Sequence, residues 1–406
     1  MNVLLITMAW PGEGESNLYT DLMLEFIEQG HQVTVASVDA NKNHRTYLSN
    51  ENNIEVLRVK TGEMQKCNKY LKVIHSFIAG PKIYYALRKY LRNKKYELIL
   101  FSTPPITWSL FVYLLKIKHH AKMYLLLKDI WPQDAVDLKA MKKGGLVWKV
   151  FRGLEKFTYY ISDYIGCMSP ANVLYIKSNN IYLKDKIIEV CPNSRREQKK
   201  NKEDNSHIID KNNIRDKYKL PKDKIIFIYG GNLGKPQGVD FLLEIIEYYK
   251  DNTEYFFLII GQGTEYKYLR DEIYSKIYSN VKILPWIPEK QFIQIVGASD
   301  VGLILLNKTS TIPNFPSRLL TYLRGKRPII AAVDKSTDIG DIIEMANCGV
   351  KAFHGDIHSF HRALISVIES EEKRKVMGDN GYQLFMKEYT AKKSYDIIMK
   401  HFNNVD

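Results

Sequence analysis

The chain has 406 residues, of which 45% are apolar and 12% aromatic, and its formal net charge is +14. Its length predicts two domains, each long enough to bury a core, and its composition excludes a disordered or fibrous chain. The four cysteines, Cys67, Cys167, Cys191 and Cys348, form no CxxC pair. This spacing argues against a zinc site and a disulfide framework, and it favours a reducing cytoplasm.

The chain begins with a strand-like apolar run rather than a basic leader, so no signal peptide is expected. The charge-free stretch 98–115 is long enough for a membrane span. A Pro104-Pro105 pair near its start instead favours a strand, a loop and the beginning of a helix.

The first half of the chain predicts a parallel sheet. A strand at 3–8, a helix at 17–29 closed by Gly30, and a strand from residue 32 form a βαβ unit. Further strands are expected at 55–59, 98–101, 123–127 and 164–168.

A polar stretch divides the chain. Residues 196–217 are rich in Lys, Asn, Asp and Glu, so we expect a linker there between domains at 1–195 and 218–390. A second series of strands is expected at 224–229, 256–260, 281–284, 301–305 and 328–332, followed by a last helix at 391–402. Two similar sheets joined in this way predict a ligand cleft between the domains.

One window is strongly basic. Between Glu63 and Glu97 there is no acid, and basic residues alternate with aromatics: Lys66, Lys69, Lys72, Lys82, Arg88, Lys89, Arg92, Lys94 and Lys95 lie among Tyr70, Phe77, Tyr84, Tyr85 and Tyr90. This mixture suits an anionic bilayer surface. A solvated basic face explains it equally well, and nucleic-acid binding is a weaker alternative.

Two glycine-rich turns follow successive strands of the second half. The first runs from Gly230 to Lys235 and leads into a helix, and the second is Gly261-Gln262-Gly263. Glycines let backbone N–H groups approach an anion, the helix start adds positive dipole charge, and Lys235 adds a point charge. Glycine turns also occur where two elements merely pack closely.

A third feature is the helix start at Pro316-Ser317-Arg318. An arginine there can hold a phosphate bidentately, although a capped helix with a surface arginine explains the pattern as well. No Asp-x-Asp pair accompanies Asp341 or Asp356, so no metal and no other cofactor is expected.

These features resemble glycosyltransferase family 4, whose members have the GT-B fold and retain the anomeric configuration. The resemblance rests on residues 28–35, the Gly231 turn and residues 316–322, with further matches at 129–132, 192–193, 284–286 and 298–303. It extends over nearly the whole chain and is strongest with the bacterial branch that builds O-antigen, capsule and exopolysaccharide. The implied fold class is α/β, with two Rossmann-like domains whose parallel sheets face a central cleft.

The resemblance also implies roles for individual residues. Those facing the donor are Gly231, Asn232, Leu233, Gly234, Lys235, Gly261, Gly263, Pro316, Ser317, Arg318, Leu319 and Thr321. The loop Gly12, Glu13, Gly14 and Glu15 is expected beside the transferring sugar, and Asp129 on the acceptor side. Arg318, Lys235 and Asp129 are the expected catalytic residues. The last helix is expected to cross back onto the first domain.

The chain departs from the family pattern in three places. Pro313 and Thr321 stand where the family has two glutamates that hold the donor sugar. Asn232 and Gln237 replace the usual Arg and Lys of the diphosphate turn, and Lys235 and Arg318 are candidates for the compensating charge. Ser102-Thr103-Pro104-Pro105 stands where the family often has a histidine.

The expected function is transfer of a hexosyl or N-acetylhexosaminyl group from a UDP-linked sugar, with retention. The expected acceptor is a polyprenyl-diphosphate-linked or other glycan, at the inner face of the plasma membrane, by a cytoplasmic peripheral enzyme. The alternatives are a sugar-nucleotide epimerase of the same fold, a non-catalytic scaffold subunit of a polysaccharide assembly complex, and a nucleic-acid-binding protein.

Overall fold

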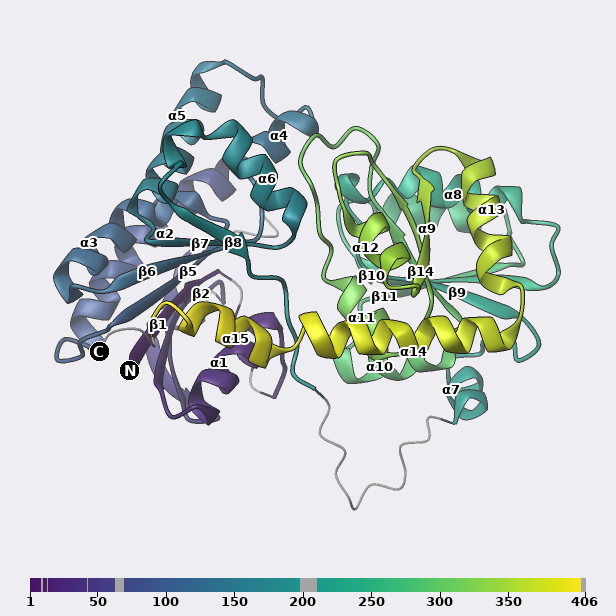
Figure 1. The fold of residues 1–406 in the computed structure, drawn as a ribbon, viewed down its shortest axis with the longest axis horizontal. Helices are drawn as coiled ribbons and strands as arrows, with labels where there is room; N and C mark the ends of the chain where they lie inside the picture. The colour runs from purple at the N-terminus through teal and green to yellow at the C-terminus, as the bar shows by residue number, and fades with distance from the viewer. Residues whose placement is uncertain (9, 13, 42, 63–68, 198–209, 403–406) are drawn as a thin grey trace. The chain divides into compact units, whose positions relative to one another are not determined.

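A computed structural model describes residues 1–8, 10–12, 14–41, 43–62, 69–197 and 210–402. The chain divides into two compact units, Met1–Arg196 with Ala391–Asp406, and Glu197–Thr390 (Figure 1). Each unit contains its own sheet and its own buried core.

The N-terminal unit is built on an eight-stranded sheet in the order β3-β4-β2-β1-β5-β6-β7-β8. All neighbouring pairs are parallel except β3 and β4. The strands are β1 (Asn2–Thr7), β2 (Gln32–Asp39), β3 (Tyr47–Glu51), β4 (Ile54–Lys60), β5 (Leu98–Thr103), β6 (Lys122–Leu127), β7 (Tyr164–Cys167) and β8 (Ile187–Val190).

Helices cover both faces of this sheet, with α2, α3 and α5 on one face and α1 and α15 on the other (Figure 1). They are α1 (Leu18–Glu28), α2 (Lys69–Tyr90), η1 (Ile106–Trp108), α3 (Ser109–His119), α4 (Gln133–Asp137), α5 (Leu146–Ile161), α6 (Pro170–Asn179), η2 (Ile181–Leu183) and α15 (Ala391–Met399). The last helix packs on α1, where Tyr395 Oη lies 2.8 Å from His31 Nε2.

The C-terminal unit has a six-stranded parallel sheet in the order β11-β10-β9-β12-β13-β14. Its strands are β9 (Ile225–Asn232), β10 (Tyr255–Gln262), β11 (Val281–Pro285), β12 (Val301–Leu305), β13 (Ile329–Val333) and β14 (Gly349–Phe353). Its helices are α7 (Lys211–Lys217), η3 (Lys235–Gln237), α8 (Val239–Tyr248), α9 (Tyr266–Ser275), α10 (Glu289–Ala298), α11 (Arg318–Arg324), α12 (Ile339–Met345), α13 (Ile357–Ile368) and α14 (Glu371–Glu388).

Three strands were missed by the sequence analysis, and all three lie at sheet edges. They are β3, β8 and β14. An edge strand pairs on one side only and needs no continuous apolar run, and the sequence Tyr-Leu-Ser-Asn-Glu of β3 has none. The strands β8 and β14 are only four and five residues long.

Part of the expected polar linker is folded. Within residues 196–217, the last seven form α7, whose Arg215 is buried. Its guanidinium makes an ion pair of 2.7 Å with Asp300 and donates to Ala298 O at 3.0 Å. A polar sequence can therefore belong to the unit because its buried charge is paired.

The apolar stretch 98–115 forms β5, η1 and the first turns of α3, as the sequence analysis predicted. Across the described part of the chain, every helix is too short or too polar to cross a bilayer.

Candidate functional site

The first glycine turn lies at the end of β9 in the C-terminal unit. Gly231 has a φ of 111°, a conformation that favours glycine. Leu233 N–H donates to Gln262 O at 2.9 Å, and Leu233 O accepts from Glu265 N–H at 2.9 Å. The turn is therefore fixed by the backbone that follows β10.

The second glycine turn packs directly on the first. A Cβ on Gly261 would lie 2.0 Å from Gly231 O, and one on Gly263 would lie 2.3 Å from Leu233 O. Close packing of two turns thus accounts for these glycines without any ligand. Their predicted position near the nucleoside stays a prediction.

Arg318 is the centre of the candidate donor site. It is the first residue of α11 and only 7% exposed, so the alternative of a surface arginine is wrong. Its Nη2 donates to Gln237 Oε1 at 2.7 Å and to Asn232 O at 3.1 Å, and its Cζ lies 4.2 Å from the centre of the Tyr229 ring. Its Nη1 is buried with no hydrogen-bond partner among the described residues.

A tyrosine one helical turn later attaches α11 to β9. Tyr322 lies four residues after Arg318 and therefore on the same helix face. Its hydroxyl accepts from Gly230 N–H at 3.1 Å and lies 3.1 Å from Ile228 O. Burial raises the pKa of Tyr322 well above its ordinary value, so the hydroxyl stays neutral.

The other predicted donor residues occupy less direct positions. Leu233 and Leu319 are fully buried, so their side chains belong to the core. Lys235 is exposed in η3, and its carbonyl accepts from Gly238 N–H at 3.1 Å. Ser317 is exposed and forms no side-chain capping bond, contrary to the expected cap. Gly234 is buried in the turn, and Pro316 and Thr321 are half-buried.

A polar cluster lies at the carboxyl ends of β1, β5 and β6 in the N-terminal unit. Tyr19 Oη is 2.5 Å from Ser102 Oγ, and Thr103 Oγ1 is buried with no partner in the described part of the chain. The neighbouring Lys128 has its pKa lowered by burial, which is partly offset by Cys191, Cys167 and Asp129.

Asp129 is the second residue after β6. Desolvation and the Asp134 carboxylate raise the pKa of Asp129 to about 6, while Lys128 opposes the shift. The side chain is nevertheless exposed, so solvent screens part of this effect. A carboxyl group in this state can accept a hydrogen bond from a sugar hydroxyl.

The loop expected beside the sugar follows β1. Glu15 N–H donates to Gly12 O at 3.1 Å, Gly14 has a φ of 80°, and Gly12, Gly14 and Glu15 are exposed. The loop is held at its start by Arg58 Nη2, which donates to Pro11 O at 2.7 Å. Glu13 lies outside the described residues.

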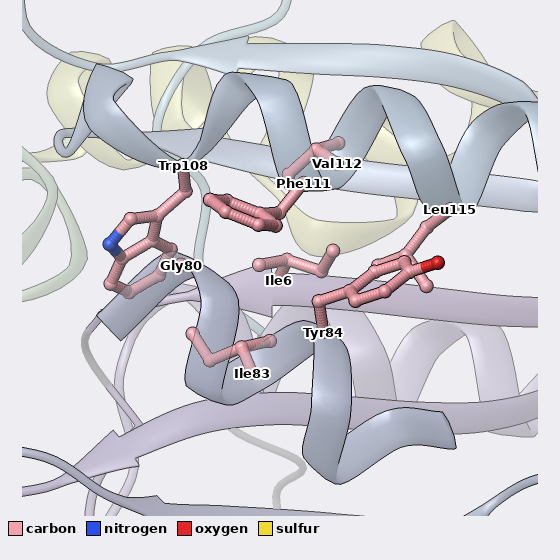
Figure 2. Close-up of a pocket in the computed structure, with 8 residues that line it drawn as sticks. All are labelled: Ile6, Gly80, Ile83, Tyr84, Trp108, Phe111, Val112 and Leu115. Carbon is pink, nitrogen blue, oxygen red and sulfur yellow. The ribbon is translucent and has the colours of Figure 1, made fainter. Parts of the chain in front are cut away.

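A cavity of about 10 Å³ lies elsewhere in this unit, between α2, α3 and β1 (Figure 2). It is lined by Ile6, Gly80, Ile83, Tyr84, Trp108, Phe111, Val112 and Leu115. Because such a volume holds at most about one water molecule, it is a packing gap rather than a substrate site. Among the described residues, no three His, Cys, Asp or Glu side chains are grouped to hold a metal ion.

Residues 210–384 match the family model described as glycosyl transferases group 1. The chain is 24% identical over 275 residues to WbjE of Pseudomonas aeruginosa, which is described as a glycosyltransferase. The aligned region covers 64% of this chain and 62% of that protein. It is 23% identical over 131 residues to WcaI of Escherichia coli K12, which is described as a colanic acid biosynthesis glycosyl transferase. The aligned region covers 32% of each of these two proteins. The chain thus matches less than two thirds of either relative's length.

Solved structures resemble the whole chain. Sucrose-phosphate synthase from Thermosynechococcus elongatus has a TM-score of 0.76 at 13% identity, covering 100% of this chain and 98% of that one. HepE from Anabaena in complex with UDP has a TM-score of 0.68 at 12% identity, covering 100% of both chains. This likeness shows the fold and confirms the GT-B class of two α/β domains with parallel sheets. The family match itself covers residues 210–384, which lie in the C-terminal unit.

Sequence reasoning missed several residues that build these sites. Tyr229 lies beneath Arg318, and Tyr322 fixes α11 to β9. The spacing of four between Arg318 and Tyr322 was a visible signal that both face the same strand. Tyr19 had no such signal, because its partner Ser102 lies 83 residues away.

Proposed function

We propose that the chain transfers a glycosyl group from a UDP-linked sugar to a glycan acceptor in surface polysaccharide biosynthesis. The observation that carries this proposal is the buried guanidinium of Arg318 beside the Gly231 turn. Its Nη1 finds no acceptor in the described part of the chain, and a diphosphate oxygen would satisfy it. The UDP held by the HepE structure supports the choice of donor.

The charge of Arg318 replaces the cation that the turn lacks. Gln237 stands where the resembling family has a lysine, and it accepts a hydrogen bond from Arg318. A lysine at position 237 would bring a second positive charge to this contact and remove the acceptor that holds Arg318. The glutamine at position 237 and the arginine at position 318 are therefore compatible with a single donor site.

This arrangement can assist departure of the nucleoside diphosphate. Negative charge accumulates on the leaving phosphate during transfer, and Arg318 together with Lys235 would stabilise it without a metal. With retention, the leaving phosphate itself takes the proton of the acceptor hydroxyl on the same face of the sugar. The transferred group is of the hexosyl or N-acetylhexosaminyl type, which makes the chain an EC 2.4 enzyme.

The test is thermal denaturation of the wild-type chain with UDP, GDP, ADP and their sugars. A ligand that binds only the folded state raises the melting temperature by mass action. We expect one nucleoside diphosphate to stabilise the chain, and Arg318→Ala to abolish that shift. Arg327→Ala is the matched control. Arg327 donates to Ser299 O, which precedes the amino end of β12, and not to the Gly231 turn. No shift with any nucleotide would contradict the proposal.

A non-catalytic scaffold subunit is the second candidate, and a specific observation favours it. Neither Pro313 nor Thr321 supplies the carboxylate that would hold the donor sugar. A scaffold would bind the nucleotide without consuming its sugar. Release of free nucleoside diphosphate on adding an acceptor supports the transferase, while release without an acceptor indicates hydrolysis.

For the acceptor, we propose a polyprenyl-diphosphate-linked glycan at the inner face of the plasma membrane, reached by a cytoplasmic peripheral enzyme. The support is the basic, aromatic window 66–95, of which residues 69–90 form α2. Transfer to a lipid-linked acceptor in vesicles, compared with a soluble oligosaccharide, tests this choice.

A further inference from the structure

Three neighbouring helices of the N-terminal unit expose apolar stripes to solvent. On α2 the stripe contains Leu71, Ile74, Ile78 and Tyr85, on α3 Leu110, Leu114 and Ile117, and on α5 Leu146, Val147 and Val150. Spacings of three, four or seven residues place the members of the α2 and α3 stripes along one side of each helix, and on α5 the three residues lie within the first turn and a half. All ten side chains are more than a third exposed, and Leu146 reaches 80%.

The helices that carry the stripes pack side by side on one face of the sheet. Figure 1 shows α2, α3 and α5 over the same face, and α3 packs against both of the others. Aromatic contacts join them: the Phe77 and Phe151 rings are 6.1 Å apart, and the Tyr84 and Phe111 rings are also 6.1 Å apart. The stripes therefore belong to one surface, which we call the α2–α3–α5 face. An extended exposed apolar surface of this kind marks a site of interaction.

The charge of this face is one-sided. The three helices contain ten Lys and Arg residues, five in α2, two in α3 and three in α5, but only one acid. That acid, Glu155, is buried in an ion pair with Arg152. By contrast, α14 of the C-terminal unit carries four basic and four acidic residues. The excess of positive charge is thus a property of these three helices rather than of every helix, although Lys116 of α3 is paired with Asp163.

We infer that the α2–α3–α5 face binds an anionic lipid bilayer, with the first turns of α5 inserted below the headgroups. The apolar stripes supply the inserted surface, and Lys142, Lys143 and Lys149 lie beside them to meet anionic headgroups. This combination distinguishes the face from a merely solvated basic surface, which has no exposed apolar stripes. The inference goes beyond the basic window 66–95, because α5 lies outside that window.

The first experiment is sedimentation of the full chain with vesicles of phosphatidylcholine, with and without phosphatidylglycerol. We expect binding to the anionic vesicles, and the triple variant L146Q/V147Q/V150Q should bind at least about tenfold more weakly. These side chains are exposed, so the melting temperature should be unchanged. The matched control is I277Q/M345Q, which replaces residues of 87% and 84% exposure in the C-terminal unit and should bind like the wild type. Equal binding by the triple variant and the wild type would overturn the inference.

The second experiment separates charge from insertion. K142Q/K143Q/K149Q should lose most of the preference for anionic vesicles, whereas K217Q/K219Q/K375Q, which changes three exposed lysines of the C-terminal unit, should keep it. At 1 M salt the screening length falls to about 3 Å, so binding that includes insertion should weaken but persist. Equal losses in the two lysine variants would overturn the inference.

The alternative to a lipid bilayer on the α2–α3–α5 face is a second protein molecule. Sedimentation velocity without vesicles should show the same oligomeric state for the wild type and L146Q/V147Q/V150Q. If the wild type self-associates and this variant does not, the face is a protein interface, and the lipid inference is overturned. Both vesicle results are read without a glycosyltransfer assay, so their failure is distinct from failure of the proposed function.

Discussion

The glycine turns of the C-terminal unit and the polar cluster of the N-terminal unit lie at equivalent places, the carboxyl ends of parallel strands, but they are built differently. In the turns, the backbone of Gly261 packs on that of Gly231, and Arg318 contacts two hydrogen-bond acceptors and an aromatic ring. In the cluster, side chains such as Tyr19 and Ser102 come from separate elements. The turns are therefore held by backbone contacts and one cation, whereas the cluster is held by contacts between side chains of separate elements.

The largest effect is expected from Arg318→Ala. Removing a group that stabilises charge in the transition state typically lowers kcat by about 10²–10³-fold. The substitution also leaves Gln237 and Asn232 O without their donor, so the free energy of unfolding should fall by about 1–3 kcal/mol. Steady-state kinetics and urea denaturation measure the two losses.

The control for this prediction is Arg327→Ala. Arg327 makes backbone hydrogen bonds to Ser299 O and Gly325 O, so its loss should destabilise the unit to a similar degree. We expect its kcat to stay near that of the wild type. If both variants lose turnover in proportion to their stability, Arg318 is structural, and the contrast between the two regions disappears.

The second prediction compares Gly261 of the turns with Gly12 of the loop that follows β1 in the N-terminal unit. Gly261→Ala places a methyl group 2.0 Å from Gly231 O, and a backbone atom cannot rotate away, so we expect a loss of about 1–3 kcal/mol or more. Gly12→Ala meets only Glu15 Oε2 at 3.9 Å and should change stability by less than about 0.5 kcal/mol. Urea denaturation of both variants is the measurement. Equal effects would show that the two loops are equally constrained.

The third prediction concerns Asp129 and pH. Its pKa rises from 3.8 to about 6 in the folded chain, so the folded state holds the proton more tightly than the unfolded state. Asp129 therefore contributes most stability below pH 3.8 and loses that contribution as the pH rises through about 6. Asp129→Asn should remove this downward slope from the unfolding free energy, and Asp185→Asn, an exposed control, should keep it.

Asp129→Asn should also act on the acceptor rather than on the donor. Losing a hydrogen bond to a charged group should raise the KM for the acceptor by about tenfold, with the UDP-induced thermal shift unchanged. A variant with a normal acceptor KM and a lower kcat would instead place Asp129 in the chemical step. Kinetics with the acceptor as the varied substrate separates these outcomes.

The sequence specified the two regions to different degrees. The turns were predictable because Gly231, Gly261 and Arg318 each lie at the end or the start of an element recognisable from its own apolar pattern. The Tyr19–Ser102 contact was not, because no local pattern shows which side chains meet when β1, β5 and β6 align. The edge strand β3 was missed for a related reason: its pairing with β4 is set by tertiary contacts rather than by its own polar sequence.

The smallest effect is expected from the Tyr19–Ser102 pair. Its two oxygens are 2.5 Å apart, so Tyr19→Phe and Ser102→Ala should each lower the free energy of unfolding by about 0.5–1.5 kcal/mol. Because each change removes the same hydrogen bond, the double variant should lose about as much as the costlier single one, a coupling measurable by urea denaturation of all four proteins. If the losses simply add, the contact contributes little in solution. The cluster would then be a set of independent side chains, and its difference from the constrained Arg318 turn would be larger still.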